Sequence, residues 1–185
     1  MGKIVIILLF FAIACSAEFR VYTDSDPAYN LGSFLTFDWL DKTNIEAGKN
    51  PVYYNELNDK RIKAAVHHEL ATRGYVLTET DAELIIHYHI MINDKDAAIP
   101  EHEADTYGPY WQRTPPYVFS YKEGTLIIDV MDAKNNLVWR GSAAAPIEEV
   151  YSGEKITKLI NKAVTKMFAA FPSTQRKQTP SPSPN

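Results

Sequence analysis

The sequence has little cysteine, no cluster of basic residues and no long apolar stretch beyond its first segment. One cysteine among 185 residues excludes a disulfide framework and any zinc site built on cysteines. Because 23 Asp and Glu outnumber 19 Lys and Arg, the chain offers no electrostatic footprint for nucleic acid. Hydrophobic residues make up 45% and charged residues 23%, a composition that indicates a globular domain rather than a fibre or a disordered chain.

Signatures of common enzyme active sites are also missing. The sequence contains no Gly-x-Ser-x-Gly elbow, no glycine-rich phosphate loop and no His-Glu-x-x-His pair. Scattered acids such as Glu101 and Glu103 cannot be paired as glycosidase carboxylates without geometry. We therefore expect a non-enzymatic protein without a cofactor, and a hydrolase is only the third hypothesis.

An apolar run near the amino terminus is typical of a signal peptide. Residues 4–14 carry no charge, and about eleven apolar residues are too few for a bilayer, which needs about 20 in a helix. Cys15 follows this run directly and resembles the acylated cysteine of the bacterial lipobox, although Ala12 stands where leucine is usual. The alternative is ordinary cleavage after Ala14 or Ala17, with Cys15 unmodified.

The leading prediction for this segment is lipidation at Cys15. Acylation would cap a lone thiol in an oxidising compartment, and each buried methylene adds about 0.8 kcal/mol to membrane anchoring. Ser16 follows the cysteine, which by resemblance to enterobacterial sorting suggests the outer membrane, with the domain facing the periplasm. A soluble periplasmic or secreted protein is the alternative. The predicted organisation is a signal peptide (1–14), a lipidated linker (15–18), a single domain (19–172) and a disordered Pro/Ser-rich tail (173–185).

Two helices are predicted from the spacing of apolar residues. One runs from about Ser152, a plausible N-cap, to Ala170, and its apolar positions recur at i, i+3, i+4 and i+7. The other runs from about Glu56 to Arg73 and ends at Gly74. His67 and His68 in the middle of this helix point about 100° apart, so we expect them to have a surface or structural role rather than to share a metal.

Alternating apolar residues predict strands at residues 19–23, 35–39, 75–78, 83–92, 125–132 and 137–143. The longest strand has one continuous apolar face, formed by Leu84, Ile86, Tyr88, Ile90 and Ile92. The order is ββαββ, a long loop, then ββα. This order favours an α+β two-layer sandwich, in which an antiparallel-rich mixed sheet carries both helices on one face.

Several segments in this order resemble a known family. They are Val21-Tyr22-Thr23-Asp24, residues 34–39, Glu69 to Tyr75, Ala82 to His89, Tyr121 to Asp129, and Leu137-Val138-Trp139-Arg140-Gly141. Together they resemble the bacterial lipoprotein family called domain of unknown function 4136, over about residues 19–171. The resemblance implies a cell-envelope lipoprotein with an α+β domain and no established activity, and it supplies no catalytic residues.

A pair of histidines is the strongest candidate for metal chemistry. His87 and His89 alternate with the apolar residues of the longest strand, so both should project from the opposite, outer face of the sheet. Asp129 could point outward from a neighbouring strand, and His102 could join from the loop. Zinc needs at least a third ligand, and packed or hydrogen-bonded histidines are the commoner arrangement, so no firm metal site is predicted. Asp129 and Arg140 are also predicted to pair across a hairpin.

The long loop predicted from Asp94 to Phe119 is acidic at first and then aromatic. Tyr110, Trp111 and Tyr117 are candidates for a ligand platform, because Tyr and Trp supply large, rigid contact area. The alternative is a loop that folds its aromatic side chains over the outer face of the sheet and buries the histidines.

The leading functional hypothesis is a non-enzymatic lipoprotein, held at the membrane by its lipid and acting by binding or by supporting the envelope. The alternative is a periplasmic metal- or small-ligand-binding protein that uses the histidine face and the aromatic loop.

Overall fold

A computed structural model describes residues 19–40, 51–99, 117–147 and 152–175. Within these ranges, six strands, two long helices and the short 3-10 helix η1 (Leu31–Ser33) occur. In chain order the other elements are β1 (Arg20–Ser25), β2 (Thr36–Trp39), α1 (Glu56–Thr72), β3 (Val76–Leu77), β4 (Leu84–Ile99), β5 (Tyr117–Asp132), β6 (Leu137–Ile147) and α2 (Gly153–Phe168).

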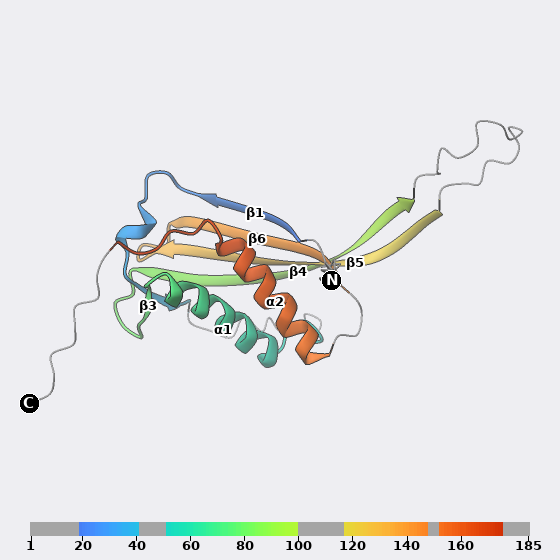
Figure 1. The fold of residues 1–185 in the computed structure, drawn as a ribbon, viewed down its shortest axis with the longest axis horizontal. Helices are drawn as coiled ribbons and strands as arrows, with labels where there is room; N and C mark the ends of the chain where they lie inside the picture. Colours follow the sequence, from blue (N-terminus) through green and yellow to red (C-terminus); the bar gives the residue numbers. More distant parts are fainter. Residues whose placement is uncertain (1–18, 41–50, 100–116, 148–151, 176–185) are drawn as a thin grey trace, which may run out of the picture.

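The strands form one mixed sheet in the order β1-β6-β5-β4-β2-β3. Strand β2 runs parallel to β3 and β4, and the other neighbouring strands are antiparallel. Helices α1 and α2 contact each other and lie side by side on one face of the sheet (Figure 1). The predicted α+β two-layer sandwich and its element order are therefore confirmed.

The helix ends also follow the predicted signals. The side chain of Ser152 accepts a hydrogen bond from the backbone N–H of Lys155 and so caps the start of α2. Past the end of α1, Gly74 has a φ of +89°, and a Cβ there would lie 2.7 Å from the methyl group of Thr174. Glycine is required at this position for both its backbone conformation and its lack of a side chain.

The core lies between the sheet and the two helices. Alternation along β4 and β5 directs their apolar residues toward the helices, as predicted. An aromatic cluster closes one end, where the Phe168 ring lies 5.0 Å from the Trp139 ring and 5.1 Å from the Phe171 ring. Among the described residues, the largest fully buried side chains are those of Phe37, Phe168, Ile62, Leu70, Leu84, Ile86, Ile128, Met167, Val66, Val130, Val138 and Val164.

The prediction of a loop from Asp94 to Phe119 is wrong at both ends, because β4 continues to Ile99 and β5 begins at Tyr117. Strand β6 pairs with β5 only as far as Lys122, so beyond this point β4 and β5 form a two-stranded ribbon that projects from the sandwich (Figure 1). Neither helix packs on this ribbon, so its strands have no buried face. Their sequences therefore lack the alternation of apolar and polar residues from which the other strands were predicted. Cross-strand polar contacts are present instead, from Lys122 to Asp94 and from Ser120 to Asp96.

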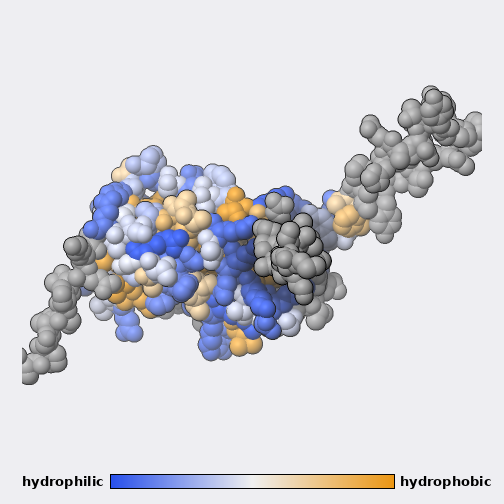
Figure 2. Space-filling view, in the orientation of Figure 1, coloured by the Kyte–Doolittle hydropathy of each residue, from blue (hydrophilic) through white to orange (hydrophobic). Residues whose placement is uncertain are grey.

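Hydrophobic side chains are nevertheless exposed on this ribbon. Figure 2 shows them beside the projecting end, where Val118 is 58% and Phe119 40% exposed.

Residues with defined contacts continue past the predicted domain boundary at residue 172. The backbone N–H of Thr174 donates to the Arg73 carbonyl, and that of Gln175 donates to the Gly32 carbonyl. Residues 173–175 therefore belong to the folded domain, and the rest of the predicted tail lies outside the described residues.

The turn between β5 and β6 is organised by one carboxylate. The side chain of Asp132 accepts hydrogen bonds from the side chain and backbone of Asn136, from the backbone of Lys134 and from the hydroxyl of Tyr29. These contacts, with the Asn136 side chain first among them, lower the pKa of Asp132 to about 2.

The lowered pKa of Asp132 predicts that the free energy of unfolding decreases at acidic pH. A carboxyl whose pKa is depressed by folding stabilises the protein above its unfolded pKa, about 3.9, and loses that contribution as the pH falls through the folded value. We expect the Asp132→Asn variant to lose less stability than the wild type between pH 4 and pH 2. Urea unfolding at a series of pH values measures this, and parallel curves for the two proteins would contradict the role assigned to Asp132.

Candidate functional site

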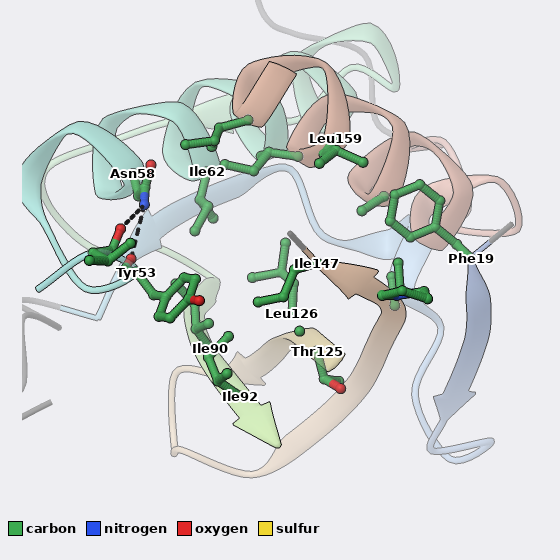
Figure 3. Close-up of a pocket in the computed structure, with 18 residues that line it drawn as sticks. Phe19, Tyr53, Asn58, Ile62, Ile90, Ile92, Thr125, Leu126, Ile147 and Leu159 are labelled. Carbon is green, nitrogen blue, oxygen red and sulfur yellow. Dashed lines mark hydrogen bonds between the residues drawn. The ribbon is translucent and has the colours of Figure 1, made fainter. Parts of the chain in front are cut away.

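A pocket of about 410 Å³ opens between the helices and the sheet, near the level where β4 and β5 leave the sandwich (Figure 3). Side chains from α1, α2 and the sheet point into it. It is lined by Phe19, Val52, Tyr53, Asn58, Ile62, Ile90, Ile92, Gly124, Thr125, Leu126, Ala143, Ala145, Pro146, Ile147, Ile156, Leu159, Ile160 and Ala163.

Small residues on facing elements leave this space unfilled. Ala143 and Ala145 lie on β6, and Ala163 lies on α2 on the other side of the pocket. At the other end of the same layer, large side chains such as Phe168 fill the gap between helix and sheet completely. A volume of this size falls within the range of small-molecule pockets, about 300–1,000 Å³.

The chemistry of the lining is almost entirely apolar. Its 18 residues include no carboxylate, imidazole, ammonium or guanidinium group. The Asn58 amide, one of its few polar groups, already donates to the carbonyls of Tyr53 and Val52 and accepts from Arg61. Burying a charged or strongly polar ligand group there would cost free energy without a compensating partner, so the pocket suits hydrocarbon.

Phe19 brings the amino-terminal end of the domain to the pocket. Its ring lines the cavity and lies against α2 (Figure 3), with the Lys162 and Lys166 ammonium groups 5.8 and 5.9 Å from the ring centre. Cys15, the predicted acylation site, precedes Phe19 by four residues and lies outside the described residues. Any group carried on Cys15 is therefore tethered close to the pocket.

The second candidate site is on the opposite face of the sheet. His87 pairs in register with Asp129, and the rings of His87 and His89 lie 4.3 Å apart and nearly perpendicular. One potential ligand atom from each of the three residues lies within 4.8 Å of the others. The predicted outward projection of the two histidines and their proximity to Asp129 are confirmed.

Arg140 competes with a metal ion for this cluster. Its guanidinium donates to both carboxylate oxygens of Asp129, over 2.6 and 2.7 Å, which raises the pKa of Arg140. The predicted pairing of Asp129 with Arg140 is confirmed, and it is bidentate, with two charge-assisted hydrogen bonds to a buried carboxylate. A metal ion would have to displace Arg140 before Asp129 could bind it.

Comparison with known proteins identifies the family. The model for a domain of unknown function, DUF4136, matches residues 21–173. The chain belongs to the DUF4136 family. This confirms the resemblance noted in the sequence, and the comparison with curated proteins finds no match.

Two solved structures resemble this DUF4136 domain at low identity. A PDZ domain protein from Parabacteroides distasonis is 16% identical with a TM-score of 0.51, and the match covers 86% of this chain but 36% of that one. A dodecamer of PelC from Paraburkholderia phytofirmans is 10% identical with a TM-score of 0.41, covering 86% of this chain and all of that one. The first likeness shows the fold alone.

Other predicted site residues fall in different places. Cys15, His102, Tyr110 and Trp111 lie outside the described residues, whereas the backbone of Tyr117 begins β5 and pairs with β4. His67 and His68, for which a surface or structural role was predicted, are both exposed on α1.

Neither described helix of the DUF4136 domain is long and apolar enough to cross a membrane.

The pocket itself was not predicted, although the run of small residues from Gly141 to Ala145 could have indicated it.

Proposed function

We propose that this protein is a non-enzymatic, lipid-anchored module of the outer membrane that faces the periplasm and binds an acyl chain in its apolar pocket. The observation that carries the proposal is the cavity of about 410 Å³ whose lining holds no charged side chain. A catalytic role is not included, because these lining residues offer no carboxylate, imidazole or amine for general acid–base chemistry.

The anchor part of the proposal comes from the amino-terminal segment. The apolar run at residues 4–14, Cys15 directly after it and Ser16 in the next position support acylation and sorting to the outer membrane. In a membrane environment, acyl chains are abundant ligands of matching chemistry. Each methylene that leaves water for the pocket contributes about 0.8 kcal/mol.

An uncharged apolar fluorophore tests the pocket. The full chain carrying Cys15→Ser, which has no acyl group of its own, is titrated with N-phenyl-1-naphthylamine. We expect saturable binding that weakens about tenfold or more when Ala145→Phe is added, because a phenyl ring there fills the cavity.

Ala144→Phe is the matched control for this titration. Ala144 is the next residue of β6 and pairs with Thr125 and Arg20, and by alternation its side chain points away from Ala145. It should leave probe binding unchanged. Equal binding by the two phenylalanine variants would show that the probe does not bind in this pocket.

A second candidate function is divalent-metal binding on the outer face, favoured by the proximity of His87, His89 and Asp129. Because Arg140 occupies both oxygens of Asp129, we expect zinc to raise the melting temperature of Arg140→Ala more than that of the wild type. Adding His87→Ala should remove the shift. Thermal melts with and without zinc measure it, and no zinc-dependent shift in either protein would eliminate this candidate.

A further inference from the structure

The pocket and the predicted acylation site are close in the chain, and their chemistry is complementary. Phe19 lines the cavity, and four residues can span at most about 14 Å back to Cys15. An acyl chain attached to Cys15 therefore starts within a short distance of an apolar cavity in its own domain.

We propose that the pocket is the binding site for an acyl chain carried on Cys15 of the same molecule. This inference rests on the proposed function, because it requires both acylation of Cys15 and binding of hydrocarbon in the pocket. The proposal requires more than one chain on Cys15, so that one chain occupies the pocket while another stays in the bilayer and holds the domain at the membrane. When the chain leaves the pocket, the domain is free to move at the end of the linker.

The tether favours this occupant over a free lipid. The lining offers no cation to a carboxylate or a phosphate inside the cavity, but Lys162 and Lys166 beside Phe19 could pair with such a group, so charge alone does not decide between the two occupants. The hydrocarbon part of a chain held covalently on Cys15 brings only uncharged methylene groups into the cavity. Its tether also gives it an effective concentration in the millimolar range, which a free ligand must exceed.

The surroundings of Phe19 fit a site that faces a membrane. Lys162 and Lys166 lie on α2 beside the Phe19 ring. With the chain from Cys15 in the pocket, these two ammonium groups would be near the bilayer surface. There they can attract anionic headgroups, which are therefore expected outside the pocket rather than in it.

Photo-crosslinking in the intact envelope tests the inference. Cells producing the full chain are fed a palmitate analogue with a diazirine in its chain, irradiated, and the protein is digested for mass spectrometry. We expect crosslinks that join the Cys15 peptide to peptides containing Ile62, Ile90, Leu126 or Leu159. Crosslinks from the Cys15-linked analogue to membrane lipids alone would overturn the inference.

Two further outcomes separate this inference from the proposed function. Pocket residues crosslinked only to analogue that is not attached to Cys15 would overturn the inference and leave hydrocarbon binding standing. A Cys15 peptide without any acyl group would overturn the inference together with the proposed anchor.

Variants on β6 provide the matched comparison. Ala145→Phe should abolish crosslinks between Cys15 and the pocket, whereas Ala144→Phe should retain them. Crosslinks that persist in Ala145→Phe would show that the chain lies elsewhere and would overturn the inference. A thermal melt confirms that each variant is folded, and the wild-type crosslink map decides the question by itself if Ala145→Phe does not fold.

Discussion

Replacing Phe168 with alanine is expected to lower the free energy of unfolding by about 3–5 kcal/mol. Phe168 is completely buried, and its ring packs against Trp139 of β6 and Phe171 beyond α2. Truncation removes these contacts and leaves a cavity that the rigid sheet cannot close. Urea unfolding of the wild type and the variant, monitored by tryptophan fluorescence, measures the loss.

Phe119→Ala is the control for this experiment. It removes the same side chain from the projecting ribbon, where Phe119 is 40% exposed and contacts the Tyr121 ring at 6.2 Å. We expect a loss below about 1 kcal/mol, because surface substitutions away from the core have small effects. Similar losses in both variants would contradict the assignment of Phe168 to the core that holds α2 on the sheet.

Arg73→Ala is expected to be nearly as damaging, with a loss of about 3–5 kcal/mol. The Arg73 guanidinium pairs with the buried carboxylate of Glu69 at 2.6 Å. It also donates to the carbonyls of Phe168 and Phe171 at the end of α2. Removing it takes one donor from each of these acceptors, removes the positive charge that pairs with Glu69 and disconnects the ends of the two helices.

Two variants identify the cause of that loss. Arg73→Lys keeps the charge but cannot reproduce the fork of donors, so we expect it to recover only part of the stability. Burial opposes ionisation of Glu69, but hydrogen bonds from Thr165 and Arg73 outweigh it and lower the pKa of Glu69. Glu69→Gln should therefore reduce the further effect of Arg73→Ala, and strictly additive losses would contradict the coupling.

The fold could be predicted because its apolar periodicities are local and uninterrupted where helices cover the sheet. Leu84, Ile86 and Tyr88 alternate along β4, and each is buried under α1 or α2. The helix ends could also be predicted from the sequence, since Ser152 caps α2 and Gly74 follows α1 with a positive φ. Burial of one face makes each of these signals strong.

The same reasoning fails where burial ends. Beyond Ile92, β4 continues through Asp94 and Asp96, whose partners Lys122 and Ser120 come from β5 more than twenty residues away. Such cross-strand pairs can be recognised only after the register of the two strands is known. The sequence of either strand alone is therefore typical of a loop. Aligning the two strand segments in antiparallel directions would have suggested that they pair.

The candidate sites show the same contrast between local and tertiary information. His87 and His89 share a face by simple alternation, and Asp129 lies opposite them in a register that the hairpin determines. The pocket depends instead on Ala143 and Ala145 of the sheet meeting Ala163 of α2 across the two layers. None of these small residues indicates a pocket in the sequence by itself. The space for a ligand arises only where they lie opposite one another in the folded domain.

Labelled palmitate incorporation, combined with the mass of the mature amino-terminal peptide, tests the central claim most directly. In cells that produce the wild type, we expect label in the protein and a peptide that begins at an acylated Cys15. The Cys15→Ser variant should incorporate no label. Recovery of the mature wild-type protein in the soluble fraction, with a free thiol at Cys15, would contradict the claim that this domain is anchored by lipid.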